Sequence, residues 1–391
     1  MIYIHIPFCR SFCTYCGFYS ELASKCRRAE DAGKQEELFG KYAEAVAAEA
    51  VWRSSEMNAD VNTLYIGGGT PSVLPLSALR HMVESLPSGT FDEFTVEVNP
   101  EDIVEKGYAY VEGLLDMGVN RVSMGVQSFD DAVLRFMNRR HDSAAARQAY
   151  NILEEAGVKN ISIDLIFGLP QLSDSLWQDT LDKALNISSR GVPPQHISSY
   201  QLSVEPESAL AGLVGRGEWS EASDELCERQ YTMLCAVLRE AGYNHYEISN
   251  FAQPGHEAVH NSAYWRHVPY VGLGPGAHSY MVQDSPIRKW STEDVHGYIL
   301  AAESGDFVQM TGYESLTPEQ MSIEHIMLGL RTSRGVESSF LHSHCDAEAL
   351  QRALAAGNLV EVSSGETGAV PFIRIPESRF FISDSIIADI I

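Results

Sequence analysis

The sequence predicts an α/β protein: a partial (β/α)6 barrel of the TIM type, followed by a smaller α+β domain. Short β-rich runs alternate with helical patterns six times, as parallel β/α units do. Polar residues stand at or just past the carboxyl ends of those runs, where β/α barrels place their chemistry. The pattern changes after about residue 240, so we expect one domain over residues 1–240 and a second over 241–391.

The six runs expected as strands are apolar and rich in β-branched residues. They cover residues 2–6, 63–66, 94–98, 121–124, 161–166 and 197–202. The run "ISIDLIF" is the most continuously apolar, which predicts a strand buried on both faces. Helical patterns lie between the runs, at residues 35–53, 76–85, 104–117, 143–156 and 175–187. Glycines follow two of these patterns directly, Gly118 and Gly157, as expected at helix ends.

This alternation alone would also allow an open doubly wound sheet. Six positions that could bind or react converge on the carboxyl ends of the runs and favour the barrel: Cys9, Gly67, Glu97, Gln127, Asp164 and Gln201. In the second domain we expect another strand at 244–252 and an aromatic, glycine-rich packed loop at 260–280. Helices should begin at Thr317, an N-cap with Pro318 and a capping-box Gln320, and near Asp346 and Asp384. Strands are expected at 359–362 and 372–375.

Charge and composition exclude several classes of protein. Lys plus Arg total 28 against 53 Asp plus Glu, a net charge of −25, which argues against nucleic acid as a partner. The helices and strands near 317–383 could form a winged helix, but residues 317–391 carry five basic and ten acidic residues. There is no apolar run of 18 residues and no signal peptide, so we expect a cytoplasmic protein that does not span a membrane. The sequence leaves the oligomeric state open, a homodimer included.

The most informative segment is "HIPFCRSFCTYCGFY", in which Cys9, Cys13 and Cys16 follow the first strand with C-x3-C-x2-C spacing. Structural zinc sites usually pair two cysteine knuckles, and no second pair exists here; Cys26 or His5 as a fourth ligand would give an unusual spacing. A 4Fe–4S cluster normally takes four cysteines, so three would leave one iron open. An open coordination position is what distinguishes catalytic metal sites from structural ones.

Further polar positions need partners. Glu97, Gln127 and Asp164 lie on otherwise buried strands, where an unsatisfied polar group is costly. Arg139 in "MNRRHD" could hold a carboxylate through a bidentate contact. The glycines of "YIGGGTPS" would let the backbone approach a ligand closely, although a tight strand–helix turn explains them equally well.

The cysteine loop after the first strand resembles that of the radical S-adenosylmethionine (SAM) enzymes. The resemblance implies that the open iron binds the amino and carboxylate groups of SAM, whose sulfonium is cleaved by one electron from the cluster. It implies that Cys9, Cys13 and Cys16 hold the cluster and that Tyr3 packs near it or near SAM. The residues that it places around SAM are Gly68, Gly69, Thr70, Glu97, Gln127, Arg139 and Asp164.

The motifs "YIHIPFC", "GGGTPS", "NRVSMGVQSF", "NRRHD" and "DLIFGLP" resemble the oxygen-independent coproporphyrinogen III oxidase group over nearly the full length. Two departures favour its HemW branch, the haem chaperones. Phe18 stands where the oxidases carry a further cysteine, and the sequence starts on the first strand, without their N-terminal extension. The HemW signature "HNxxYW" is matched at residues 260–265.

These features imply a haem chaperone that transfers haem to acceptor haemoproteins while carrying a 4Fe–4S cluster and SAM. Within the signature, His260 is the expected haem ligand, because a neutral imidazole is a common axial ligand and Tyr264 and Trp265 supply flat apolar surface. Packing of a domain junction is the alternative, and His267 and His278 compete as ligands. The alternative function is the anaerobic oxidase, which decarboxylates coproporphyrinogen III to protoporphyrinogen IX. A radical SAM methyltransferase or haem-degrading enzyme is a third.

Overall fold

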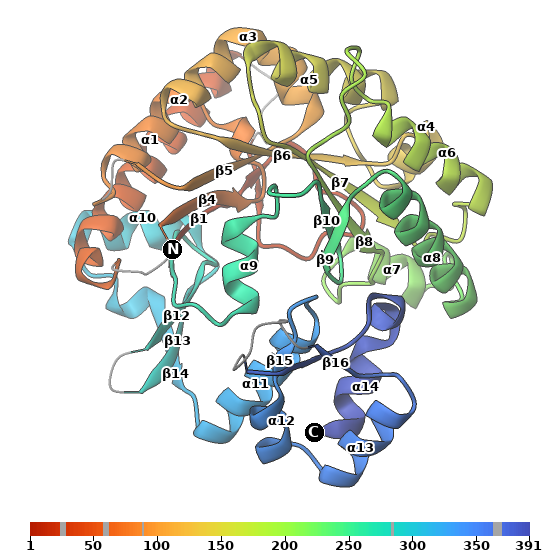
Figure 1. Cartoon of the computed structure of the whole chain (residues 1–391). Coiled ribbons are helices and arrows are strands. Elements are labelled where there is room, and N and C mark those ends of the chain that lie inside the picture. The colour runs from red at the N-terminus through yellow and green to blue at the C-terminus, as the bar shows by residue number, and fades with distance from the viewer. Residues whose placement is uncertain (24–28, 58–61, 88–89, 283–284, 363–369) are drawn as a thin grey trace.

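The computed structural model describes residues 1–23, 29–57, 62–87, 90–282, 285–362 and 370–391, without the side chains of 29–32. A large α/β unit carries the N-terminus, and a smaller unit with the C-terminus lies beside it (Figure 1). Cys26 lies outside the described residues. Among the described helices, none is long and apolar enough to cross a membrane.

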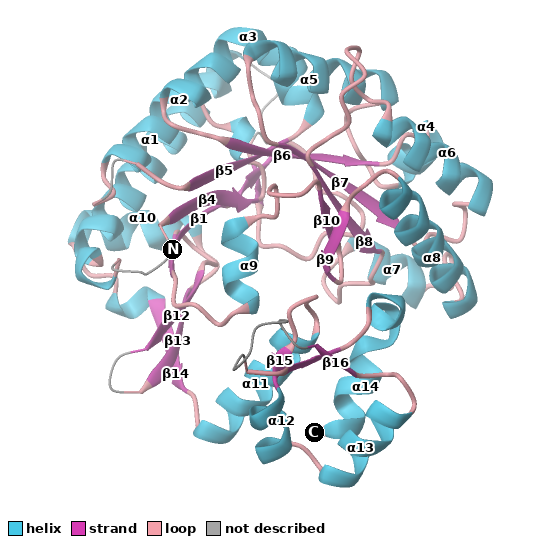
Figure 2. Ribbon diagram, viewed as in Figure 1, coloured by secondary structure: helices cyan, strands magenta, loops and turns pink. Residues whose placement is uncertain are grey.

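The core is a nine-stranded sheet that curves into an open barrel (Figure 2). Six strands in sequence order run parallel at its centre, which confirms the predicted (β/α)6 arrangement. They are β1 (Ile2–Ile6), β4 (Thr63–Gly68), β5 (Glu93–Val98), β6 (Arg121–Gln127), β7 (Ile161–Phe167) and β8 (His196–Gln201). The edge strands of this sheet are not paired with each other, so the barrel is not closed.

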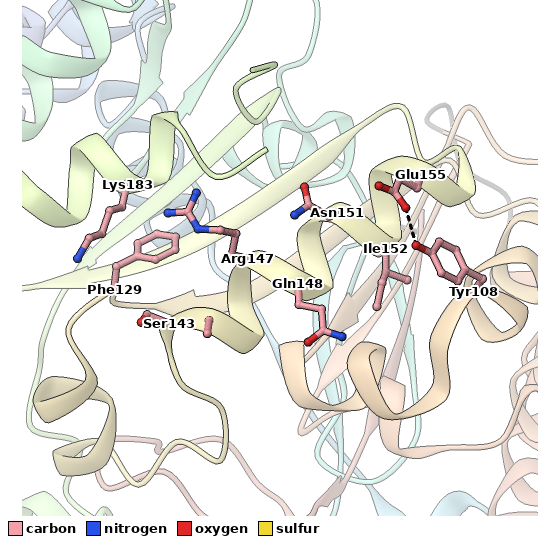
Figure 3. Close-up of a pocket in the computed structure, with 10 residues that line it drawn as sticks. Tyr108, Phe129, Ser143, Arg147, Gln148, Asn151, Ile152, Glu155 and Lys183 are labelled. Carbon is pink, nitrogen blue, oxygen red and sulfur yellow. Dashed lines mark hydrogen bonds between the residues drawn. The ribbon is translucent and has the colours of Figure 1, made fainter. Parts of the chain in front are cut away.

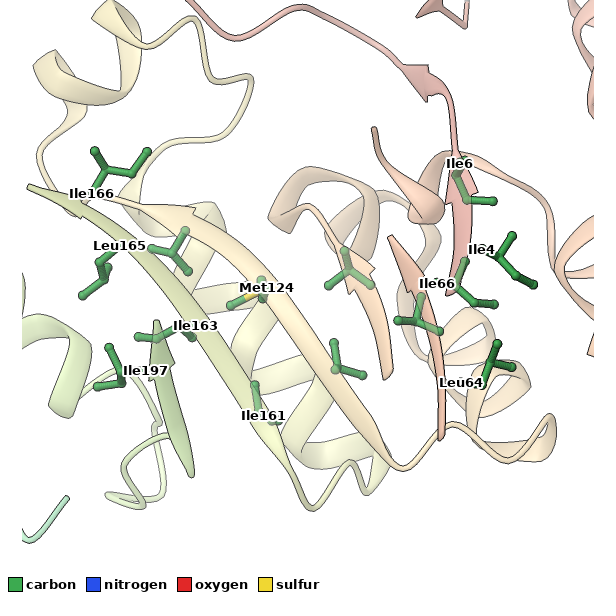
Figure 4. Close-up of a cluster of buried hydrophobic side chains, with 14 of the residues drawn as sticks. Ile4, Ile6, Leu64, Ile66, Met124, Ile161, Ile163, Leu165, Ile166 and Ile197 are labelled. Carbon is green, nitrogen blue, oxygen red and sulfur yellow. The ribbon is translucent and has the colours of Figure 1, made fainter. Parts of the chain in front are cut away.

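Helices cover the outer face of this sheet (Figure 1). They are α1 (Ala29–Trp52), α2 (Leu76–Glu84), α3 (Pro100–Asp116), α5 (Ser143–Ala156), α6 (Asp174–Leu185) and α8 (Asp224–Glu240). Two shorter helices, α4 (Asp131–Phe136) and α7 (Ala209–Gly215), lie against the segment that holds the three cysteines, through hydrogen bonds of Thr14 with Phe136 and Leu210. The strand residues that face the outer helices are buried and apolar, among them Ile4, Ile66, Met124 and Ile163 (Figure 4). This apolar layer is the main source of the hydrophobic stabilisation of the barrel.

Strand β7 is buried on both faces, as predicted for "ISIDLIF": every residue except Asp164 is buried, and Asp164 is half-buried. The face that points into the barrel is nevertheless polar, because Ser162 and Asp164 alternate with the apolar residues and meet the side chains of neighbouring strands. The Ser162 hydroxyl lies 2.8 Å from Nδ1 of His196, and Ser123 donates to Asp164 at 3.2 Å. Asp164 stands in the middle of its strand, not at the carboxyl end as expected.

Three strands that follow residue 240 belong to the same sheet. β11 (Val271–Leu273) pairs in parallel with β1, and β10 (Asn250–Ala252) pairs antiparallel with β8 and with β9 (Asn244–Glu247). The single strand expected at 244–252 is thus a hairpin. The domain boundary at residue 240 stays a prediction, but a division that keeps this sheet whole falls after Leu273.

The aromatic segment expected as a packed loop contains regular structure. α9 (Val259–Trp265) lies at the open side of the barrel (Figure 1), and its residues reach the first residues of two strands. A three-stranded meander follows, formed by β12 (His278–Val282), β13 (Pro286–Ser291) and β14 (Thr311–Ser315). Helix α10 (Val295–Ser304) packs on α1.

The C-terminal unit has the expected α+β composition. Helix α11 (Pro318–Leu330) begins with the predicted capping box of Thr317 and Gln320. The remaining elements are β15 (Val336–Glu337), α12 (Ser338–His344), α13 (Ala347–Ala355), β16 (Val360–Val362), β17 (Phe372–Arg374) and α14 (Ser383–Ile390). Of these, β15 and α12 were not predicted, because each is too short to show a period in the sequence.

Candidate functional site

The cysteine loop stands at the carboxyl end of β1. Its ends are tied together where β2 (Phe8–Cys9) pairs with β3 (Glu21–Leu22). Thr14, which directly follows Cys13, is fixed by backbone hydrogen bonds to Met137 (3.2 Å) and from Leu210 (2.8 Å). The three sulfurs are unpaired and half-buried. The loop is thus held from both sides while its thiols stay accessible.

Arg10 anchors this loop to the outer helices. Its guanidinium pairs with Glu105 and lies 3.4 Å from the carboxylate of Asp102, both on α3. Ser72 donates to Asp102 at 2.7 Å, so the anchor extends to the segment after β4. The position of Cys9 and Cys13, on either side of Arg10, is therefore coupled to α3.

A chain of polar contacts links two of the cysteines. The Cys9 sulfur lies 3.5 Å from the Thr70 hydroxyl, which accepts a hydrogen bond from Asn99 at 3.2 Å. Arg139 donates to Asn99 at 2.6 Å and to the Cys13 sulfur at 3.4 Å. Four residues predicted from the sequence are thus brought together. The fifth, Asn99, was missed, although its place between β5 and Pro100 marks it as a loop residue at the reactive edge.

The glycines after β4 lie directly against the cysteine loop. A Cβ on Gly69 would stand 2.8 Å from the carbonyl oxygens of Ile6 and Phe8 and 3.1 Å from the Cys9 sulfur. Gly68 has a φ of +107°, and a Cβ there would lie 2.6 Å from the ring of His5. Both positions require glycine, one for space and one for conformation as well. The backbone at Gly68 and Gly69 consequently lies closer to the cysteine loop than residues with a side chain would allow.

Two carboxyl groups lie deeper in the barrel. Tyr65 donates to Glu97 at 2.7 Å, and the Gly68 amide donates to the same carboxyl at 3.2 Å. Burial raises the pKa of Glu97 to about 7, against the opposing effect of the Tyr65 hydrogen bond. Burial also raises the pKa of Asp164. The predicted SAM residues on β4, β5 and β7 therefore share one polar interior.

The raised pKa of Glu97 predicts a pH-dependent stability that Glu97→Gln weakens. Between pH 4.5, the usual pKa, and about pH 7 the folded chain keeps a proton that the unfolded chain has released. Glu97 therefore contributes a fall in the free energy of unfolding as the pH rises through this interval. Glu247, whose pKa burial also raises to about 7, contributes a further fall, and His260, whose pKa burial lowers to about 3, contributes a rise, so the variant should differ from the parent by the Glu97 contribution alone. Urea unfolding of SAM-free protein from about pH 4 to about pH 8 measures it, and an unchanged slope would contradict the assignment.

Gln127 and Tyr3 complete the predicted set. Gln127 is 9% exposed, and its φ of +66° is rare for a residue with a side chain, which marks a strained position. The side chain of Gln127 folds back over Gly125, where a Cβ would lie 2.8 Å from the Gln127 side-chain nitrogen Nε2. The Tyr3 hydroxyl lies 3.0 Å from Nδ1 of His5, and its ring lies 6.1 Å from that of Tyr65. Tyr3 therefore faces the polar interior beside β4.

The donor set fits an iron–sulfur cluster better than a single ion. Within the described residues, no group of three or more His, Cys, Asp or Glu side chains is arranged around one metal position. In a cubane cluster each thiolate binds a separate iron, so the sulfurs need not converge on one point. Burial raises the pKa of Cys9, and that of Cys16 to about 11, so a bound metal centre is needed to keep them as thiolates.

His260 does not have the environment expected of a haem ligand. It is fully buried, and its Nδ1 and Nε2 lie 2.8 Å from the Thr63 hydroxyl and 2.9 Å from the Tyr264 hydroxyl. Glu93 accepts from its backbone amide at 3.0 Å, and burial lowers its pKa to about 3. Thr63 and Glu93 open their strands, so His260 lies at the end of the barrel opposite the cysteines. Both ring nitrogens of His260 are therefore engaged in hydrogen bonds, and its role as a haem ligand stays a prediction.

Arg121 is a polar residue of the interior that the sequence did not single out. It is 1% exposed, with one contact to the Thr95 hydroxyl at 3.5 Å, and its Nε and Nη2 have no partner among the described residues. The sequence signal that could have identified Arg121 is a charged residue at the first position of a strand expected to be buried.

A surface pocket of about 590 Å³ lies between α3, α5 and α6 (Figure 3). It is separate from the barrel interior, since none of the predicted site residues line it.

Comparison with known proteins first gives the class. The family model described as "Radical SAM superfamily" matches residues 3–184, the part of the chain that holds the cysteine loop and the glycine segment. Proteins of this class carry a 4Fe–4S cluster and use S-adenosylmethionine. The whole chain gives the particular family: it belongs to the family of the heme chaperones HemW, as the following relatives show.

Heme chaperone HemW of Synechocystis is 33% identical over 85% of this chain and 78% of its own length. HemW of Bacillus subtilis is 34% identical over 85% and 84%, and that of Mycobacterium tuberculosis 32% over 92% and 88%. Among solved structures, coproporphyrinogen III oxidase (HemN) from Escherichia coli aligns with a TM-score of 0.77, 21% identity, and coverage of 99% of this chain and 89% of that one. At 21% identity, this similarity shows a common fold and nothing further about function.

Proposed function

We propose that this protein is a haem chaperone, which binds haem and delivers it to acceptor haemoproteins. The observation that carries the proposal is the identity of 32–34% to HemW chaperones over 85–92% of the chain. The similarity to the HemN oxidase supports only a common fold. Phe18 stands where the oxidases carry a cysteine, and its side chain is 72% exposed. Because this side chain is a phenyl ring, the position offers no further thiolate to a cluster or a substrate.

The proposal includes the cofactor residues. Cys9, Cys13 and Cys16 would hold the cluster, leaving one iron for the amino and carboxylate groups of SAM. When bound, the cluster supplies one electron at a time. The residues assigned to SAM are Tyr3, Gly68, Gly69, Thr70, Glu97, Gln127, Arg139 and Asp164. Two observations support this assignment. A chain of contacts links two of the cysteines in the order Cys9–Thr70–Asn99–Arg139–Cys13, and the glycine segment after β4 lies against the cysteine loop.

Each of these residues has a role that follows from its chemistry. Arg139 has its Nε buried without a partner, so a donor remains for a carboxylate. Glu97, with its pKa near 7, can accept from an ammonium group and change its protonation on doing so. Asp164 can accept from ribose hydroxyls, which lack charge and are therefore compatible with its raised pKa. The Gly69 backbone packs directly against the Ile6 and Phe8 carbonyl oxygens and the Cys9 sulfur, so it holds the cysteine loop in place.

We further propose a cytoplasmic location and no nucleic-acid partner, with a homodimer as one assembly to be tested. All six cysteines among the described residues are unpaired, as expected in a reducing compartment. The net charge of −25 opposes binding of phosphate backbones.

Haem transfer tests the proposed function. We expect anaerobically reconstituted protein to bind haem and to pass it to an apo-haemoprotein, followed by the Soret band of the acceptor. In parallel, incubation with SAM, a reductant and coproporphyrinogen III should leave the porphyrinogen unchanged. Formation of protoporphyrinogen would identify the protein as an oxidase instead, and failure to bind haem would remove the chaperone function.

A further inference from the structure

Three histidines near the HemW signature could serve as a haem ligand, and their environments differ. His260 has both ring nitrogens hydrogen-bonded inside the barrel. His267 stacks on Tyr280 with ring centroids 4.4 Å apart, and its Nε2 lies 3.1 Å from the carboxylate of Glu324. His278 is exposed, and among the described residues neither of its ring nitrogens takes part in a hydrogen bond. His278 is therefore the only exposed histidine of the three, and it presents both ring nitrogens, whereas the half-buried His267 has only its Nδ1 left.

His278 is also held close to the cofactor site. It opens β12, and its carbonyl oxygen is so close to Gly272 that a Cβ there would lie 2.0 Å away. Gly272 is registered with Tyr3 on β1. A Cβ on Gly274, four residues before His278, would lie 2.7 Å from the His5 carbonyl oxygen. His278 thus stands beside the strand that leads into the cysteine loop.

The loop before His278 contacts the cysteine loop itself. A Cβ on Gly276 would lie 3.2 Å from the ring of Tyr19, three residues after Cys16. The Tyr19 carbonyl in turn lies 3.0 Å from Nε2 of His5. Gly274 donates to the buried carboxylate of Glu49 at 2.9 Å, which fixes the start of the same loop. The position of His278 relative to the cluster loop is therefore set by rigid packing.

A flat aromatic surface lies next to this histidine. The indole of Trp290 is registered with His278 across β12 and β13, with ring centroids 6.3 Å apart and planes 28° apart. On its other side the indole lies on Gly312, where a Cβ would come within 2.4 Å of it. Trp290 is 37% exposed. An imidazole nitrogen beside an accessible indole matches the needs of a porphyrin, which takes an axial nitrogen and flat apolar contact.

We propose that His278 is the axial ligand of haem iron, with Trp290 as a contact for the porphyrin. The proposal rests on the chaperone function proposed above and assigns its cargo to a site at the edge of the cofactor interior. Accessibility suits a protein that must release its cargo, because an exposed ligand can be exchanged by an acceptor without opening the barrel. His260 then has a structural role, joining α9 to β4 through Thr63.

Haem titration of the full reconstituted protein tests the ligand. In difference spectra against haem-free protein, we expect His278→Ala to weaken haem binding by about tenfold or more and to shift the Soret band. Added imidazole should restore the spectrum, which it would not do for a merely structural residue. Iron content and unfolding should stay as in the parent, since the side chain is exposed. Trp290→Ala should weaken binding without changing the ligand spectrum.

His342→Ala is the matched control, because His342 is also exposed and its Nδ1 lies 2.7 Å from the Ser338 carbonyl, which leaves Nε2 free. If the parent binds haem and His278→Ala leaves affinity and spectrum unchanged, the ligand assignment is wrong while the chaperone function stands. If haem binding were lost only in His342→Ala or only in His260→Ala, the assignment of His278 as the ligand would also be wrong. A parent that binds no haem removes the chaperone function itself.

Discussion

Replacement of Cys9, Cys13 and Cys16 together by alanine should abolish the iron–sulfur cluster. Anaerobic reconstitution should give about four irons per chain in the parent and almost none in the variant, with loss of the charge-transfer absorbance. The reason is that thiolates are the ligands such clusters take, and the nearby Thr70 and His5 are already engaged, Thr70 with Asn99 and His5 with Tyr3 and Tyr19. Iron and sulfide analysis together with the visible spectrum measures the effect.

A matched control separates loss of ligands from loss of structure. Cys345 is also unpaired and half-buried, but it follows α12 in the C-terminal unit, and Cys345→Ala should keep the full cluster. The three loop cysteines are not part of the apolar core, so the triple variant should unfold like the cluster-free parent. A triple variant that retains cluster absorbance would refute the ligand assignment and with it the proposed SAM site.

The parts of this fold that could be predicted are those set by local pattern. Short apolar runs rich in β-branched residues located all six parallel strands, and the Thr317–Gln320 capping box located the start of α11 to the residue. The cysteine spacing was equally local. Its neighbours Thr70 and Arg139 could be named because they follow strands, and parallel strands bring their carboxyl ends to one edge.

The parts that could not be predicted depend on which long-range contacts form. His260 looked like a ligand because a histidine beside Tyr264 and Trp265 suits a porphyrin. Only the packing of α9 against the first residues of β4 and β5 shows that both its nitrogens are engaged. Asp164 was expected at a strand end because "ISIDLIF" hides its alternation: Leu165 and Ile166 are both apolar. The pairing of β11 with β1 joins residues about 270 apart, for which a sequence pattern carries no signal.

Gly69→Ala should damage the cofactor site without removing a ligand. The new Cβ would stand 2.8 Å from two backbone carbonyl oxygens, and the Gly69 amide donates to one of them, that of Ile6, at 2.7 Å. Backbone atoms cannot turn aside as a flexible side chain can, so the cysteine loop has to move. Overpacking of this kind costs about 1–3 kcal/mol. Because Cys9 lies against the same position, we also expect weaker binding of SAM to the reduced cluster, seen as a loss of the SAM-induced change in its EPR spectrum.

Gly40→Ala is the control for this glycine. Gly40 lies within α1 with no atom within 4 Å of an added Cβ, so alanine should be neutral or should stabilise the helix by up to about 1 kcal/mol. The two variants add the same methyl group and differ in what it meets. If Gly69→Ala matched Gly40→Ala in both urea unfolding and SAM-induced EPR changes, the glycine segment would not be packed against the cysteine loop. The proposal that the SAM site depends on the close approach of the Gly69 backbone would then be wrong.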